Sequence, residues 1–107
     1  MDDNPTFEKL RDYVLALNRR FPNGNDPFQI MTRLLEECGE LAQQVNHFEA
    51  SGIKRDKYGE PDKVKLAQEV KGVLFCAMQV ALYYEIENEL AQSIEASYQR
   101  IKAEGLI

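Results

Sequence analysis

The stretch GVLFCAMQVALYY, residues 72–84, decides the fold class of this 107-residue chain because it contains no charged side chain. Together with the residues before it, it places apolar side chains three and four positions apart: Leu66, Val70, Val73, Ala77, Val80 and Tyr84. That spacing predicts an α-helix with one apolar face, and Asp62 is placed to cap it. The run is too short to cross a bilayer, so we expect it to be buried within a helical bundle or against a second subunit.

Three other segments show helical spacing, and none alternates with a period of two. One begins near Thr6 and ends before the prolines and glycine of residues 22–27. The next begins at Asp26 and Pro27, a cap followed by a first-turn proline, and its apolar residues are Met31, Leu34, Cys38, Leu41, Val45 and Phe48. The last follows a break near Glu85 and ends at Gly105. We predict an all-α fold, a single domain over residues 1–107 forming an antiparallel bundle of four to five helices that assembles as an oligomer.

Charge and cysteine usage narrow the class of protein. Lys and Arg number 13 against 18 Asp and Glu, and this net charge of −5 argues against a nucleic-acid binder. The acidic, polar start is unlike a secretory signal, and no membrane association is expected. Cys38 and Cys76 lie within apolar helical patterns, so we interpret them as reduced core thiols of a cytoplasmic protein.

Three glutamates, Glu36, Glu37 and Glu40, crowd five residues of one predicted helix. At about 100° per residue, Glu37 and Glu40 take the same positions relative to their apolar face as Glu69 and Gly72 take on the next long helix. If these helices pack side by side, the two flanks face one groove. A solvated acidic face is the alternative, but like charges at these spacings cost about 0.2–0.5 kcal/mol per pair. Clustered carboxylates with few matching cations are what a hard divalent cation requires.

The segment LLEECGEL, residues 34–41, resembles the first half of the signature of the MazG-like all-α nucleotide pyrophosphohydrolases, E-E-x-x-E. Residues 66–74, LAQEVKGVL, align with the second half, E-x-x-D, with 28 residues between Glu40 and Glu69. The resemblance implies hydrolysis of a nucleoside triphosphate to the monophosphate and pyrophosphate with Mg²⁺ or Mn²⁺, as in the house-cleaning of noncanonical nucleotides. It also implies a homodimer or tetramer. Glu37, Glu40 and Glu69 would hold the metal, and Glu36 would orient or deprotonate the attacking water.

The chain departs from that signature at Gly72, where the final aspartate is expected. Three explanations stay open. The site is catalytically weakened and kept for binding nucleotide or protein, or a water replaces the missing oxygen, or a carboxylate such as Asp56 or Asp62 enters from elsewhere. A small residue also lets a bulkier group approach. Restoring the ligand with Gly72→Asp is expected to tighten the dependence on Mg²⁺ if the site is a weakened hydrolase site.

The remaining candidate residues are cationic. Lys54, Arg55 and Lys57 form a basic loop that could close over a triphosphate or be solvated. Arg100, late in the last helix, complements the helix dipole or, by the resemblance, contacts phosphate. His47, the single histidine, is expected at the surface. A purely structural helical assembly is a further alternative, and the sequence leaves the preferred base and sugar open.

Overall fold

The computed structural model describes residues 5–49 and 53–107, with the backbone alone for residues 53–55, and all regular structure in these ranges is helical. Five helices follow in order: α1 (Thr6–Arg20), α2 (Pro27–Glu49), α3 (Ile53–Tyr58), α4 (Lys63–Tyr83) and α5 (Glu87–Ala103). The predicted all-α class is confirmed. The short helix α3 was not predicted, because six residues are too few to show helical periodicity.

The predicted helix ends are confirmed in their hydrogen bonds. Asp26 Oδ1 accepts from the backbone N–H groups of Phe28 at 2.9 Å and Gln29 at 3.0 Å, at the start of α2. Asp62 caps α4 in the same way, accepting from the N–H of Val64 at 2.8 Å. The break before α5 passes through Glu85, whose φ of 54° lies in the left-handed region that ends a helix.

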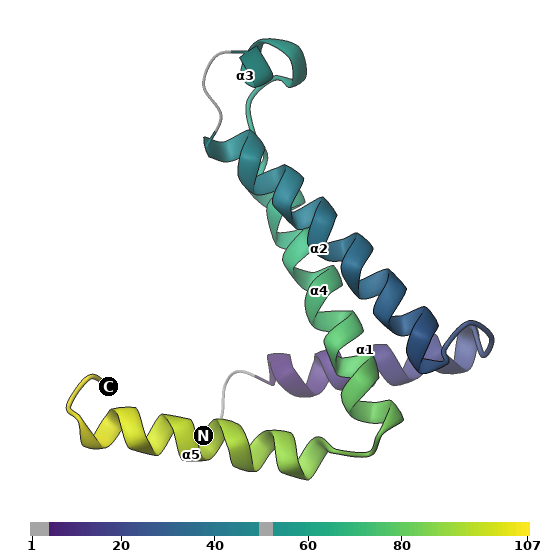
Figure 1. Cartoon of the computed structure of the whole chain (residues 1–107), viewed down its shortest axis with the longest axis vertical. Coiled ribbons are helices and arrows are strands. Elements are labelled where there is room, and N and C mark those ends of the chain that lie inside the picture. Colours follow the sequence, from purple (N-terminus) through teal and green to yellow (C-terminus); the bar gives the residue numbers. More distant parts are fainter. Residues whose placement is uncertain (1–4, 50–52) are drawn as a thin grey trace.

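Helices α2 and α4 form an antiparallel hairpin with α3 at its tip (Figure 1). At the opposite end of the hairpin α1 crosses α4, and their contact forms a small core around Val14, Met78 and Ala81. Helix α5 leaves from that end and projects away from the hairpin (Figure 1). The antiparallel pairing of neighbouring long helices is therefore confirmed for α2 and α4.

The apolar face predicted for each long helix is divided into two rows, each with a spacing of seven residues. One row on each helix is half-buried in the hairpin: Leu34, Leu41 and Phe48 on α2, and Leu66, Val73 and Val80 on α4. The other row on each helix is exposed: Met31, Cys38 and Val45 on α2, and Val70 and Ala77 on α4, continued by Tyr84 at its C-cap. Rows at heptad spacing on one helix are typical of a bundle in which each helix packs against two neighbours.

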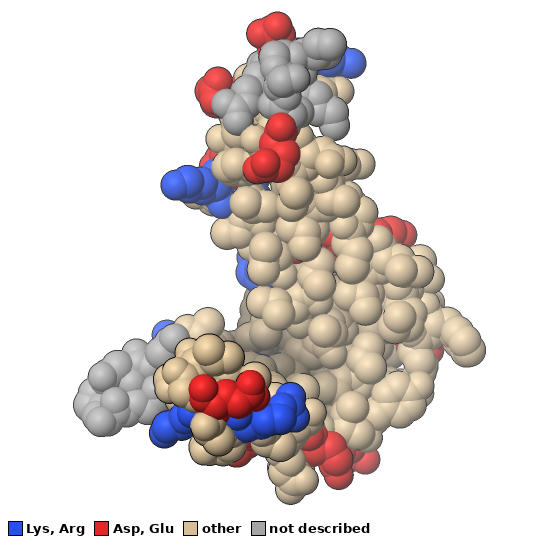
Figure 2. Space-filling view, turned by 60° about the vertical axis from the view of Figure 1, so that its left-hand side comes forward, with Lys and Arg blue, Asp and Glu red and all other residues tan. Residues whose placement is uncertain are grey.

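One chain does not close a compact bundle by itself. Its radius of gyration is 17.2 Å, against about 13 Å for a compact domain of this length. Its accessible surface is 8295 Å², about a third more than the roughly 6,100 Å² expected for a 12.3 kDa monomer. Figure 2 shows a face of the hairpin with few charged side chains, and α5 has no buried residue.

The two cysteines differ in burial. Cys76 is buried in α4, as predicted, whereas Cys38 is exposed on α2, so its prediction as a core thiol is wrong. Burial raises the pKa of the Cys76 thiol, followed by the nearby negative charge of Glu37. Cys76 is therefore held in its unreactive protonated form. Among the described residues, no helix is long and apolar enough to cross a bilayer.

Candidate metal centre

The hairpin brings together Glu37, Glu40 and Glu69, the three glutamates predicted as metal ligands. One carboxylate oxygen from each lies within 4.8 Å of the others. Helix α2 contributes the first two and α4 the third, so the two flanks do face one groove. Two oxygens bound to the same Mg²⁺ are at most about 4.2 Å apart, twice the Mg–O distance. Small rotations of these side chains would therefore bring all three onto one ion.

The negative charge of this cluster is poorly compensated. Burial raises the pKa of the Glu37 carboxyl, and the charges of Glu40 and Glu36 raise it further. Burial also raises the pKa of Glu69, which shares a hydrogen bond with Glu40 and feels its charge and that of Glu37, against a smaller opposing effect of Lys65. Each group is pushed toward its protonated form, and a bound cation would relieve that repulsion.

Gly72 lies directly under the carboxylate of Glu37. A Cβ atom at position 72 would lie 2.8 Å from Glu37 Cδ and 3.5 Å from Cγ, with Glu37 Oε2 closer still. The space for the signature's aspartate is thus occupied by Glu37. Of the carboxylates considered as replacements, Asp62 caps α4 and Asp56 is on α3, and neither belongs to the three-glutamate cluster.

Glu36, predicted to act on the attacking water, is exposed on α2 and lies outside the cluster of three. Its charge nevertheless raises the pKa of Glu37, so it is near the cluster without belonging to it. Arg33, four residues before Glu37, is the cation that the helical spacing would pair with this glutamate. Its guanidinium donates instead to the Gly24 carbonyl at 2.6 Å and to Gln79 Oε1 at 3.2 Å.

That guanidinium belongs to a polar network that sequence reasoning missed. Gln79, only 4% exposed, accepts from Arg33 and donates to Asn18 Oδ1 at 3.0 Å, and Arg33 also donates to Asn25 Oδ1 at 3.2 Å. The network ties α1 and the α1–α2 loop to the hairpin beside the cluster. Its signal in the sequence was Gln79 itself, the single amide in the otherwise apolar run of residues 72–84.

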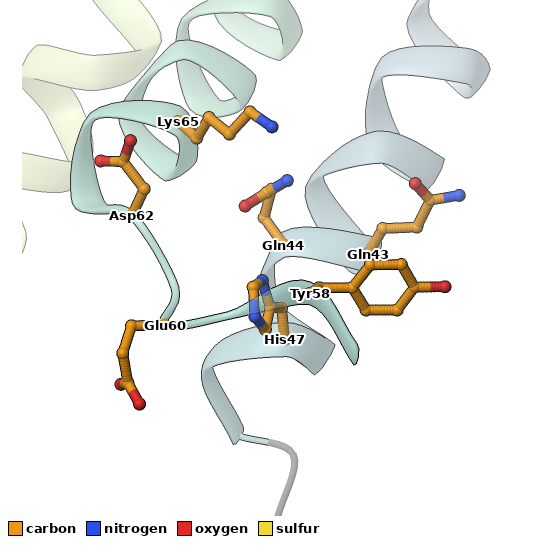
Figure 3. A pocket seen from close by; sticks show the side chains of 7 residues that line it. All are labelled: Gln43, Gln44, His47, Tyr58, Glu60, Asp62 and Lys65. Carbon is orange, nitrogen blue, oxygen red and sulfur yellow. The ribbon is translucent and has the colours of Figure 1, made fainter. Parts of the chain in front are cut away.

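Two hollows flank the cluster along the hairpin. The larger, which we name the loop-end cavity, measures about 640 Å³ and lies toward α3 (Figure 3). Its wall includes Gln43, Gln44, His47, Tyr58, Asp62 and Lys65. The smaller, named the α1-side pocket, measures about 210 Å³ and lies toward α1. Its wall includes Tyr13, Arg33, Glu37, Lys71, Gly72 and Phe75.

Lys57 and Arg100, the predicted cationic residues whose side chains are described, do not lie at the cluster. The side chains of Lys54 and Arg55 lie outside the described residues. The Lys57 ammonium on α3 is 5.3 Å from the centre of the Tyr58 ring, at the hairpin tip. Arg100 is in the last turn of α5, which projects away from the hairpin, so it does not approach the cluster of its own chain (Figure 1).

His47 is half-buried rather than freely exposed. Its Nε2 lies 2.7 Å from the Gly59 carbonyl, which fastens the segment after α3 to α2. This contact makes His47 part of the wall of the loop-end cavity.

The fold and the cluster define an all-α protein with a candidate carboxylate metal site. No family model matches the chain, and no solved structure matches it. Over 75 residues it is 39% identical to YpjD, an uncharacterized protein of Bacillus subtilis (strain 168). The match covers 70% of this chain and 60% of that protein. The chain therefore spans less than two thirds of its relative's length, and the relative's name states no activity.

Proposed function

We propose that the chain is a cytoplasmic, metal-dependent nucleoside triphosphate pyrophosphohydrolase of the MazG-like type. The observation that carries the proposal is the meeting of Glu37, Glu40 and Glu69 from two helices within 4.8 Å. Burial and the mutual repulsion of the carboxylates raise the pKa values of Glu37 and Glu69, and a bound cation would offset both effects. Negatively charged oxygen donors are the ligands that Mg²⁺ prefers, and Mn²⁺ binds similar ligands.

In the proposed reaction, the three glutamates would hold the ion, which would supply positive charge to neutralise phosphate oxygens. Glu36, exposed beside the cluster, accepts a proton from a water molecule. The water oxygen forms a bond to the α-phosphorus, and the bond from that phosphorus to the oxygen bridging to the β-phosphate breaks. Pyrophosphate leaves and the nucleoside monophosphate remains.

We further propose that the working unit is a homodimer, or a tetramer built from such dimers. The exposed row of each hairpin helix has the heptad spacing of a bundle core, and the chain exposes about a third more surface than a compact monomer. A second hairpin would cover these rows and complete a four-helix bundle.

Pyrophosphate release from a panel of nucleoside triphosphates tests the hydrolase proposal. We expect turnover with Mg²⁺ or Mn²⁺, none with EDTA, and loss of turnover in the double variant Glu37→Ala, Glu40→Ala. Glu49→Gln, an exposed glutamate at the end of α2, is the matched control and should keep full activity. Turnover that survives the double substitution would contradict the proposal.

Gly72 favours a second candidate, a nucleotide-binding module without turnover, because position 72 offers no ligand atom. The same preparation separates the two functions when metal-dependent nucleotide binding is measured by calorimetry beside the assay. Binding without pyrophosphate release would support the module and contradict the hydrolase.

A further inference from the structure

We propose that the loop-end cavity is the pocket that holds the nucleobase of the substrate, with the Gln44 amide hydrogen-bonding the edge of the base. As a description of substrate binding this inference rests on the proposed function. The cavity itself is independent of catalysis, and its volume of about 640 Å³ falls within the range of small-molecule sites, about 300–1,000 Å³.

The position of the cavity suits a substrate that spans cavity and cluster. Gln44 lies four residues after Glu40 on α2, and Lys65 lies four residues before Glu69 on α4. Because the two helices are antiparallel, both steps lead one helical turn, about 6 Å, from the cluster toward the hairpin tip.

The charge of the two hollows decides which end of a nucleotide each one takes. Among the described residues of its wall, the loop-end cavity sets the carboxylate of Asp62 against the ammonium of Lys65, so no excess of positive charge attracts phosphate there. In the α1-side pocket Arg33 and Lys71 outnumber Glu37, which favours the phosphate end. A triphosphate laid across the cluster therefore directs its uncharged base toward the loop-end cavity.

The wall of the cavity carries groups that can recognise a planar heterocycle by hydrogen bonding and stacking. The amides of Gln43 and Gln44 project from α2, the Tyr58 ring comes from α3, and Lys65 approaches from α4 (Figure 3). Amides pair with the donor and acceptor atoms on base edges, and aromatic rings supply a stacking surface.

Gln44 provides an independent reason to expect a ligand. Its Oε1 atom is buried, and it has no hydrogen-bond partner among the described residues. An enclosed acceptor without a partner is costly, and such atoms are few in native proteins. A base that offers an N–H group would satisfy this amide after rotation about its last side-chain torsion, which is soft.

Nucleoside binding without metal tests this proposal separately from hydrolysis. In EDTA, the ribonucleosides and deoxyribonucleosides are titrated to millimolar concentration against ¹⁵N-labelled protein. We expect at least one to shift the side-chain signals of Gln44 and His47. Gln44→Met should weaken that binding roughly three- to tenfold, the value of one hydrogen bond, while Gln92→Met on exposed α5 should not change it. Methylation of the Watson–Crick edge of the tightest nucleoside should weaken binding similarly.

A second readout uses the hydrolysis assay. Gln44→Met should lower kcat/KM for the preferred triphosphate roughly three- to tenfold and leave ribose 5-triphosphate, which has no base, unaffected. If no nucleoside shifts these signals, or if Gln44→Met behaves as Gln92→Met, the pocket is wrong even where hydrolysis is observed. If hydrolysis is absent and nucleosides still bind as expected, the hydrolase proposal fails and the pocket stands.

Discussion

Gly72 is the residue at which the candidate site departs from the signature, and the structure changes the meaning of that departure. The sequence indicated that this glycine replaces a metal ligand of the signature. In the fold, the carboxylate of Glu37 occupies the volume where a side chain at position 72 would begin. The glycine therefore lets Glu37 approach the backbone of α4 and reach Glu69.

We expect Gly72→Ala to separate stability from metal binding. Alanine in a helix interior is favoured over glycine by about 1 kcal/mol, and the obstructing atom is the mobile end of Glu37. The variant should therefore fold at least as stably as the wild type in urea. Its Mg²⁺ affinity by calorimetry should fall roughly tenfold, because Glu37 must turn away from the cluster.

The same geometry reverses the expectation for Gly72→Asp, which should also weaken Mg²⁺ binding because a side chain at position 72 displaces the Glu37 carboxylate. Gly39, whose Cβ position is open, is the matched control on α2, and Gly39→Ala should leave Mg²⁺ binding unchanged. Unaltered Mg²⁺ affinity in Gly72→Ala would contradict this account of Glu37.

The raised pKa of Glu37 predicts how stability depends on pH. Without metal, the Glu37 carboxyl binds its proton more tightly in the folded state than in the unfolded state, in which glutamates have a pKa of about 4.3. The stabilising contribution is therefore complete below that pH and is lost as pH rises through the folded pKa. Urea midpoints of the metal-free wild type should fall more between pH 4 and pH 7 than those of Glu37→Gln.

Saturating Mg²⁺ should remove this difference, since the ion replaces the proton as the neutralising charge. Glu49→Gln, far from the cluster at the end of α2, should follow the wild type at every pH. Parallel pH profiles for wild type and Glu37→Gln would show that the carboxylate is not destabilised in the fold.

At the scale of the helices, the local signals predicted the boundaries well. Asp26 and Asp62 cap the helices they were expected to cap, because capping depends on a side chain and the two or three residues that follow it. The meeting of Glu37, Glu40 and Glu69 followed from the helical period once two helices paired. Capping is a short-range property of the chain, whereas the meeting of the glutamates also required the pairing of α2 with α4.

The sequence did not predict the features that depend on which face of one helix packs against which other helix. The apolar face of α2 was taken as one stripe, whereas the side facing α4 also includes the half-buried Glu37 and Gln44, seven residues apart, beside its half-buried row. A heptad reading would have placed both in the hairpin. The loop-end cavity draws on three elements and has no local signal. The amide of Gln79 stands out in its apolar run, but its contact with Arg33 joins residues 46 apart, so local spacing does not identify the partner.

The cap of α2 offers a test at this scale. We expect Asp26→Ala to lower the free energy of unfolding by about 1 kcal/mol, because the N–H groups of Phe28 and Gln29 lose their acceptor. Asp26→Asn, which retains a capping oxygen, should stay within a few tenths of a kcal/mol of the wild type in urea unfolding. Equal losses in both variants would mean that the charge matters and the hydrogen bonds do not.

At the scale of the whole molecule, the hairpin has two different sides. At about 100° per residue, the exposed rows lie roughly 100° around α2 from Glu37 and around α4 from Cys76. In an antiparallel pair, equal offsets in the same rotational sense place both rows on one side of the hairpin. Glu40 and the Gly72 backbone lie on the other side, so the apolar surface and the cluster are separate.

That separation predicts that assembly can be removed while the metal site is kept. Leu35 is 68% exposed and Leu74 is 51% exposed, each within the exposed apolar side of its helix. A second hairpin docked there would bury both, and a glutamate at either position would place an unpaired charge in that interface. We expect sedimentation to give twice the 12.3 kDa chain mass for the wild type and one chain mass for Leu35→Glu, Leu74→Glu.

Gln68→Glu, which adds the same charge to the opposite side of α4, should leave the assembly unchanged. Because Glu37, Glu40 and Glu69 come from one chain, the dissociated double variant should still bind Mg²⁺ by calorimetry. A wild type that sediments as one chain would contradict the dimer, and the exposed rows would then need a different partner. A dissociated variant that loses Mg²⁺ binding would show that the second hairpin completes the site, although all three glutamates belong to the first.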